Sequence, residues 1–130
     1  MAVHIPLVIS GPNVQKGLYS DALVELQDLA CTILDFAGLT MEEAKDSVSL
    51  MPVLTGEAHT LRKFQISGLD EGPQHLGKWR MVSDGEWKLI VERDQRDRLY
   101  ALKDDPWENW DVAGNYPNIT ALRLRFSHCK

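Results

Sequence analysis

Two cysteines and a row of acidic side chains are the residues of this chain best able to carry chemistry. Cys31 and Cys129 lie far apart, and neither has a second Cys or a His at the short spacing that a zinc site requires. Cys31 is expected to be a small core residue, because thiols behave as buried apolar groups. His128 and Cys129 could bind a stray metal ion, but a frayed chain end is the default expectation there.

The acidic side chains recur at helical spacing between Ser20 and Gly38 and could be imagined as a cation site. They are Asp21, Glu25, Asp28 and Asp35, with Thr32 among them, and an apolar stripe of Leu23, Leu26, Ala30, Ile33, Leu34 and Ala37 lies opposite. Evenly spaced charges on the polar side are what any surface helix shows. The pattern therefore predicts a helix over residues 21–37 with a solvated acidic face, ended by Gly38 in a left-handed conformation.

Composition limits the classes of partner. The chain has 130 residues, 44% apolar and 25% charged, which is typical of one soluble globular domain. The formal charge of −5 argues against nucleic acid and against an anionic membrane surface, because either attracts a concentrated basic face. No stretch approaches the length of a membrane span, and no signal peptide is visible, so small molecules or proteins remain as partners and the compartment stays open.

Hairpin signals dominate the second half of the chain. Strands are predicted at residues 64–67, 79–83, 86–92 and 98–102, with Asp84 and Gly85 as a two-residue turn that pairs Ser83 with Glu86. Short helices are expected at 50–54 and 119–126. The fold class that follows is α+β, a small antiparallel sheet of about four strands packed with helices.

Residues 4–10 predict a strand of a different kind, because their apolar positions are consecutive rather than alternating. This pattern is typical of a strand covered on both faces. No parallel partner for this strand is evident in the sequence. The sheet would also expose an apolar face bearing Trp79, Met81 and Ile90. Both features predict self-association, with the first ten residues exchanged between copies or paired at an edge.

Five segments together resemble the C-terminal portion of sulfatases of the alkaline-phosphatase superfamily. Residues 5–12 (I-P-L-V-I-S-G-P) are similar to V-P-L-I-V-x-G-P, and residues 27–38 (Q-D-L-A-C-T-I-L-D-F-A-G) to V-D-L-A-P-T-L-L-D-L-A-G, with Cys31 in place of Pro. Residues 47–56 (S-V-S-L-M-P-V-L-T-G) resemble G-x-S-L-x-P-L-L-x-G, with Ser47 in place of Gly. Residues 80–90 resemble the hairpin R-M-V-R-x-G-x-Y-K-L-I, and residues 99–113 resemble L-Y-D-L-x-x-D-P-x-E-x-x-N-L-A.

The resemblance implies a fragment without its own catalytic residues. In that family a formylglycine made within C/S-x-P-x-R is the nucleophile, and a divalent cation, usually calcium, sits among Asp and Asn ligands. Neither cysteine here matches that motif, and the ligand segments precede the V-P-L-I-V strand. Residues 1–20 are then expected to be a remnant strand and linker of the large catalytic domain, and residues 21–130 the closing subdomain. Catalytic and metal residues are expected to be absent, the missing N-terminal catalytic domain is the expected partner, and calcium and formylglycine are expected in the full-length parent.

The family's C-terminal subdomain often sends a loop toward the active-site mouth, and residues 70–78 are the candidate. His75 and Lys78 in this loop are weak candidates for contact with an anionic or sugar substrate, and a solvated turn is the competing interpretation. Lys88 is expected to be structural, its stem covering a neighbouring Trp.

Three functions remain in competition: a fragment of an enzyme that hydrolyses sulfate esters, a fragment of a phosphonate or phosphodiester hydrolase of the same superfamily, and a non-catalytic binding or assembly module. The coding sequence upstream of Met1 discriminates among them.

Overall fold

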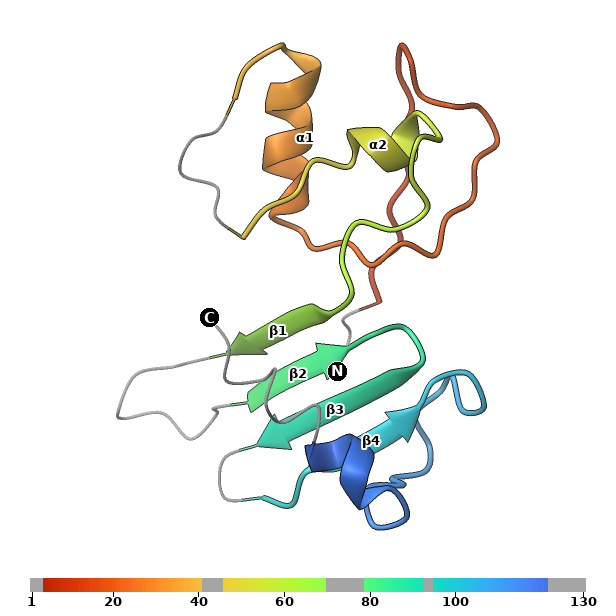
Figure 1. Ribbon diagram of the computed structural model, residues 1–130, viewed down its shortest axis with the longest axis vertical. Coiled ribbons are helices and arrows are strands. Elements are labelled where there is room, and N and C mark those ends of the chain that lie inside the picture. The colour runs from red at the N-terminus through yellow and green to blue at the C-terminus, as the bar shows by residue number, and fades with distance from the viewer. Residues whose placement is uncertain (1–3, 41–45, 70–78, 93–94, 122–130) are drawn as a thin grey trace. The chain divides into compact units, whose positions relative to one another are not determined.

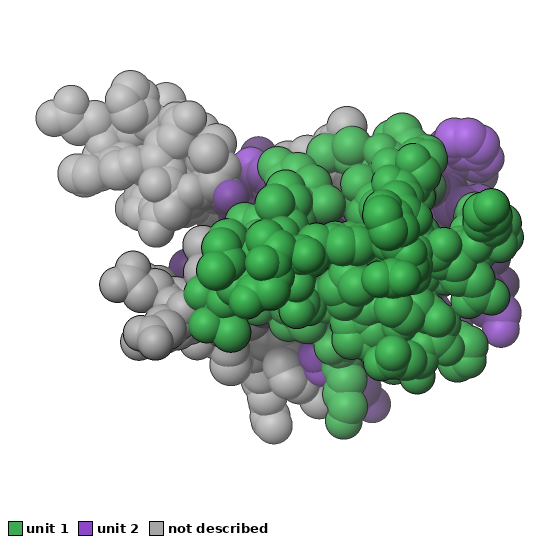
Figure 2. All heavy atoms as spheres, turned by 90° about the horizontal axis from the view of Figure 1, so that it is seen from above, with its two compact units in different colours: residues 1–63 green, residues 64–130 purple. Residues whose placement is uncertain are grey.

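The structure of the chain is a computed structural model that describes residues 4–40, 46–69, 79–92 and 95–121. The chain divides into two compact units, residues 1–63 and 64–130, coloured green and purple in Figure 2. The predicted boundary at residue 20 lies inside the first unit. Within the described ranges, no helix is long and apolar enough to cross a membrane.

The described residues of unit 1 contain two helices, α1 (Asp28–Phe36) and α2 (Met51–Leu54) (Figure 1). The end of α1 is as predicted. Gly38 has φ 69°, its N–H donates to the carbonyl of Asp35, and the N–H of Leu39 donates to the carbonyl of Leu34. This pair of bonds is the Schellman motif, which satisfies carbonyls that the last turn leaves free.

The start of α1 differs from the prediction, because the helix begins at residue 28 rather than 21. The N–H groups of Asp28, Leu29 and Ala30 donate to carbonyls three residues back, so a tight turn leads into the helix. The loop before it has its own local bond, from the N–H of Ala22 to the hydroxyl of Ser20.

The predicted strand at residues 4–10 is wrong for this chain, since these residues form no strand. Val8 is 92% exposed, and Ile5 and Leu7 are exposed as well. A strand exists only when a neighbour supplies its hydrogen bonds, and no strand of the described residues lies beside this segment.

The described residues of unit 2 form a four-stranded antiparallel sheet, as predicted, and its strand order is β1-β2-β3-β4 (Figure 1). The strands are β1 (Gln65–Leu69), β2 (Trp79–Ser83), β3 (Trp87–Glu92) and β4 (Arg98–Ala101). Residues 117–121 are helical, so the tail helix starts two residues before the predicted start at residue 119. The rest of the predicted helix, residues 122–126, lies outside the described residues.

The β2–β3 turn forms one residue later than predicted. Ser83 pairs with Lys88, not with Glu86, and the N–H of Asp84 donates to the carbonyl of Trp87. Gly85, with φ 88°, is then the first of two turn positions, the place where a type II′ turn requires glycine. Because the register differs by two residues, every side chain keeps the sheet face that the prediction gave it.

Both sheet faces are buried at their centre. One face carries a row across all four strands, Ile66, Val82, Leu89 and Leu99, and only Ile66 at the edge is exposed. The other face carries Met81 at 1% and Ile90 at 5% exposure. The expectation that Met81 and Ile90 lie on an open face is therefore wrong.

The segment after β4 covers the outer edge of the sheet. The side chain of Asp111 accepts the N–H of Leu99, and the N–H of Val112 donates to the carbonyl of Leu99, at 3.1 and 2.9 Å. These bonds occupy the backbone groups that an edge strand would otherwise offer to another chain. The same segment brings Tyr116 edge-on to Trp87 on the sheet face that holds Leu89, with ring centroids 5.0 Å apart.

Candidate functional site

The substrate-binding candidates predicted from the sequence, His75 and Lys78, lie in residues 70–78, outside the described residues. The residues on either side are Leu69 and Trp79, which are paired directly in the β1–β2 ladder. The segment therefore leaves and re-enters the sheet at one point. Next to that point, Gly68 lies against β2 so closely that a Cβ there would be 2.8 Å from the carbonyl oxygen of Trp79.

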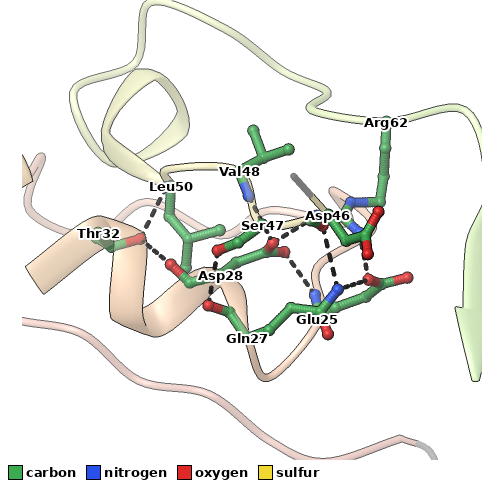
Figure 3. A network of polar contacts seen from close by, with 9 residues as sticks. All are labelled: Glu25, Gln27, Asp28, Thr32, Asp46, Ser47, Val48, Leu50 and Arg62. Atoms are coloured by element: carbon green, nitrogen blue, oxygen red, sulfur yellow. Dashed lines mark hydrogen bonds and ion pairs between the residues drawn. The ribbon is translucent and has the colours of Figure 1, made fainter. Parts of the chain in front are cut away.

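A network of polar contacts surrounds Asp28 in unit 1 (Figure 3). This carboxylate is fully buried and accepts three hydrogen bonds. Its donors are the N–H of Glu25 at 2.7 Å, the N–H of Val48 at 2.9 Å and the guanidinium of Arg62 at 2.5 Å. A buried carboxylate is tolerated only with such partners, so Asp28 joins three separate segments of unit 1.

Thr32 and Asp35 continue this cluster along α1. The Thr32 hydroxyl donates to the carbonyl of Asp28 at 2.6 Å and accepts the N–H of Leu50 at 2.9 Å, while the Ser49 hydroxyl donates to Asp35 at 2.6 Å. Thr32 is 3% exposed. The prediction of a solvated acidic face is therefore wrong at Asp28 and Thr32, because this side of α1 faces residues 47–50 rather than water.

Arg62 supplies the positive charge of the cluster. Its guanidinium forms ion pairs of 2.5 Å with both Glu25 and Asp28, and its side chain is 13% exposed. Two carboxylates and one guanidinium leave a single net negative charge. The arrangement offsets part of the negative charge of the two acids and holds backbone amides, which is a structural task rather than acid–base chemistry.

Neither calcium nor a catalytic nucleophile fits the described residues. No group of three or more His, Cys, Asp or Glu side chains in these ranges is placed to hold a metal ion. Glu25 and Asp28, the nearest approach to a carboxylate site, are already paired with Arg62. Cys31 is half-buried and is followed by Thr-Ile-Leu, which is not the motif of a formylglycine precursor.

A second buried charge lies in unit 2. Lys88 is 3% exposed, and its ammonium lies 2.6 and 2.7 Å from the two carboxylate oxygens of Glu108. The expectation that Lys88 is structural agrees with this burial and with the ion pair to Glu108. Glu108 has φ 58°, a left-handed conformation uncommon for a residue with a side chain.

Asp111 fixes the next turn of the same segment. Burial by itself would raise the pKa of Asp111, but the N–H of Ala113, the guanidinium of Arg96 and the N–H of Leu99 donate to its carboxylate and lower the pKa below its ordinary value. The charge of Arg96 acts in the same direction. Asp111 is therefore ionised and hydrogen-bonded at neutral pH.

Sequence reasoning missed the roles of Arg62 and Glu108 and misplaced Asp28. The signal available was the resemblance itself. Asp28, Thr32, Asp35, Ser49 and Leu50 are all positions of the quoted family patterns, and in the structure they bond to one another. The same holds for Lys88 and Glu108, which belong to the patterns quoted for residues 80–90 and 99–113. These patterns describe a framework, not a catalytic centre.

The framework and the small sheet define the C-terminal region of a sulfatase. The family model of the N-sulphoglucosamine sulphohydrolase C-terminal region matches residues 1–126, and the chain belongs to this family. Its curated relatives include arylsulfatase K of Xenopus laevis, 32% identical over 124 residues, and arylsulfatase K of Homo sapiens, 30% identical over 129 residues. These matches cover 88% and 92% of this chain.

Solved structures agree with the family. A structure described as a complex with its substrate D-glucosamine-2-N,6-O-disulfate is 28% identical to this chain, covers 76% of it and has a TM-score of 0.64. The phosphonate monoester hydrolase of Agrobacterium radiobacter, 22% identical over 78% of the chain with a TM-score of 0.58, shares the fold.

The chain spans about a quarter of the proteins it matches, 23% and 24% of the two arylsulfatases and 22% of the disulfate-bound structure.

Proposed function

We propose that this chain is the closing subdomain of an enzyme that hydrolyses sulfate esters of amino sugars, and that it has no turnover by itself. The observation that carries this proposal is the family match over residues 1–126, together with the 28% identity to a structure that holds a sulfated glucosamine. D-Glucosamine-2-N,6-O-disulfate is the substrate of that protein, and it indicates the substrate class for the enzyme that contains this chain.

In this proposal the role of the chain is to hold the segment 70–78 at the mouth of the active site. The pairing of Leu69 with Trp79 brings the two ends of the segment together on the sheet. His75 and Lys78 would then offer hydrogen-bond donors and positive charge to a sulfated sugar. The competing interpretation of a solvated turn predicts no effect of either residue on substrate binding.

Calcium and the formylglycine nucleophile would be supplied by the rest of the enzyme. The described residues do not fit either group, because the acids of α1 are bound to Arg62 and to backbone amides. Formylglycine, when present, supplies the attacking oxygen, and calcium supplies positive charge near the sulfate.

The experiment compares the chain with the longer polypeptide encoded by its gene. We expect no turnover of a chromogenic sulfate ester by the purified chain, with or without calcium, and turnover by the longer polypeptide. An upstream sequence containing C/S-x-P-x-R and paired Asp residues supports the proposal. Metal-dependent turnover that co-elutes with the 130-residue chain would contradict it, as would an upstream sequence without that motif.

The substrate class is tested in the longer polypeptide with paired chromogenic esters. Hydrolysis of a phosphonate monoester in preference to a sulfate ester would favour the phosphonate hydrolase alternative, whose known structure shares this fold. In the same polypeptide, replacement of His75 or Lys78 by Ala should raise KM for a sulfated amino sugar. Unchanged KM in both variants would favour the solvated-turn interpretation.

We also propose self-association of the isolated chain, which rests on the exposed apolar side chains of Ile5, Leu7 and Val8. The sheet face no longer supports it, since Met81 and Ile90 are buried. Sedimentation at micromolar concentration should show dimers or larger species that disappear when residues 1–10 are deleted. A monomer unchanged by the deletion would reject self-association through this segment.

A further inference from the structure

Two tryptophan side chains of unit 2 are exposed to solvent. Trp107 is 84% exposed and Trp110 is 59% exposed, and both belong to the segment that follows β4 (Figure 1). Tryptophan is highly buried on average in proteins, because its ring carries a large apolar area. Two such rings three residues apart differ from apolar residues scattered singly over a surface, and exposed apolar patches mark binding sites. We call residues 105–111 the tryptophan loop.

Hydrogen bonds fix the backbone from which the two rings extend. One carboxylate oxygen of Asp105 accepts the N–H of Trp110 at 2.8 Å, and the other accepts the side-chain amide of Asn109 at 3.1 Å. Glu108 lies between the two tryptophans in the sequence, and its carboxylate is paired with the buried ammonium of Lys88. A surface whose backbone is fixed in advance loses less conformational entropy when a ligand binds.

The framework of unit 2 does not depend on either ring. In the pattern L-Y-D-L-x-x-D-P-x-E-x-x-N-L-A, Asp105 and Glu108 match fixed positions, whereas Trp107 and Trp110 fall on variable positions. The residues that hold the loop are therefore those of the family pattern, and the exposed tryptophans are additions to it. The two rings are available for a role that belongs to this chain in particular.

The charges of the tryptophan loop and its surroundings favour a cationic ligand. Four of these charged residues cancel in ion pairs, Lys88 with Glu108 and Arg96 with Asp111. The other charged residues at positions 103–111 are Lys103, Asp104 and Asp105, so one net negative charge is left. This charge repels a sulfate group, whereas an ammonium group is attracted to a carboxylate and to the face of an indole ring.

We propose that the tryptophan loop binds a glucosamine unit whose amine carries no sulfate. The inference rests on the proposed function, in which the substrate is a sulfated amino sugar, because hydrolysis of an N-sulfate leaves an amine that is cationic at neutral pH. The apolar C–H face of the sugar ring stacks on Trp107 or Trp110, and the ammonium group pairs with the exposed carboxylate of Asp104. A sugar chain would then be held by the units from which sulfate has been removed.

The test measures binding of a short oligomer of unmodified glucosamine to the longer polypeptide encoded by the gene. By calorimetry, we expect the unaltered polypeptide to bind the oligomer, and Trp107→Ala and Trp110→Ala each to weaken binding about tenfold, because each removes a stacking surface. Tyr19→Ala is the matched control, since Tyr19 is an aromatic residue of unit 1 that is 86% exposed, and it should bind like the unaltered polypeptide.

The role of the amine is tested with two further ligands and one further variant. Oligomers of N-acetylglucosamine and of N-sulfoglucosamine lack the ammonium group and should bind at least about tenfold more weakly than the glucosamine oligomer. Asp104→Asn should weaken binding of the glucosamine oligomer and reduce its dependence on salt, because the ion pair is lost.

Equal affinity of both tryptophan variants and the unaltered polypeptide would overturn the inference, provided circular dichroism shows the variants folded. Absence of binding by the unaltered polypeptide would also overturn it, as would tighter binding of the N-sulfated oligomer. Failure of the proposed function is a separate result. A polypeptide that hydrolyses phosphonate monoesters in preference to sulfate esters, yet binds the glucosamine oligomer through Trp107 and Trp110, would reject the proposed function and leave the sugar site in place.

Discussion

The ammonium of Lys88 lies between both carboxylate oxygens of Glu108, and the residue that supplies this carboxylate has a left-handed backbone. Lys88 is the second residue of β3, and Glu108 lies in the segment after β4, twenty residues further on. A left-handed conformation costs a residue such as glutamate about 1 kcal/mol or more. The ion pair therefore holds the segment in a conformation that it would not adopt by itself.

Replacing Glu108 should lower the free energy of unfolding more than replacing Lys88. Glu108→Gln leaves the ammonium of Lys88 buried without a counter-charge and should lower the free energy of unfolding by about 3 kcal/mol. Lys88→Met should cost less, because the Glu108 side chain is 29% exposed and can turn toward water. Urea unfolding followed by tryptophan fluorescence measures both, and a larger loss for Lys88→Met would show that the pair is not the main restraint.

Hydrogen exchange can resolve the cluster around Asp28 amide by amide. Asp28→Asn places an NH₂ group against donors and should speed exchange at Val48, whose N–H donates to this side chain. Thr32→Val should speed exchange at Leu50 instead, because the threonine hydroxyl accepts that N–H. The loss expected for a buried unsatisfied donor is about 1–3 kcal/mol. Equal effects of both variants at both amides would indicate general unfolding of unit 1 rather than local loss of a bond.

Two glycines form a matched pair of test positions in unit 2. A Cβ at Gly68 would lie 2.8 Å from the carbonyl oxygen of Trp79 and 3.2 Å from the Cγ of Arg80, whereas a Cβ at Gly114 would meet nothing within 4 Å. Gly68→Ala should therefore destabilise the β1–β2 pairing by about 1–3 kcal/mol. Gly114→Ala should be neutral or slightly stabilising. Thermal unfolding of the two variants decides the matter, and equal midpoints would contradict the close approach at Gly68.

Acid should loosen unit 2 through Asp111. Because the pKa of Asp111 is lowered in the folded chain, its contribution is present above the pKa of the unfolded chain and is lost as pH falls through the folded value. The stabilisation by Asp111 is therefore lost in the range below about pH 4. Asp111→Asn should lower the free energy of unfolding at neutral pH and should weaken its dependence on pH under acidic conditions. Urea unfolding midpoints measured from acidic to neutral pH test both effects. If the variant loses stability with falling pH in the same way as the unaltered chain, other carboxylates cause that loss.

The strands could be predicted from the sequence, because alternating apolar residues and a glycine-containing turn are local signals. The position of the β2–β3 turn could not, since the side chain of Asp84 accepts the N–H groups of Glu86 and Trp87 and displaces the turn by one residue. The inner face of α1 was predicted wrongly for a different reason. Asp28 is buried because Val48 and Arg62 donate to it, and no local pattern places residues 20 and 34 positions away beside a helix.

The strand at residues 4–10 shows the limit of composition. A run of β-branched residues indicates that a segment can form a strand, but the hydrogen bonds come from a neighbour, and the described residues supply none. The resemblance to a sulfatase region was confirmed over residues 1–126, while His75 and Lys78 stay a prediction.

The pleat of β2 and β3 also limits how this hairpin can change in length over evolution. Each register of Ser83 against β3 that differs by two residues keeps Met81 and Ile90 on one side and Val82 and Leu89 on the other. Insertions or deletions of an even number of residues at Gly85 and Glu86 leave both packed sides intact. A single inserted residue that shifts the register would move every side chain of one strand to the opposite face of the sheet. The lengths of homologous hairpins should therefore differ by even numbers of residues.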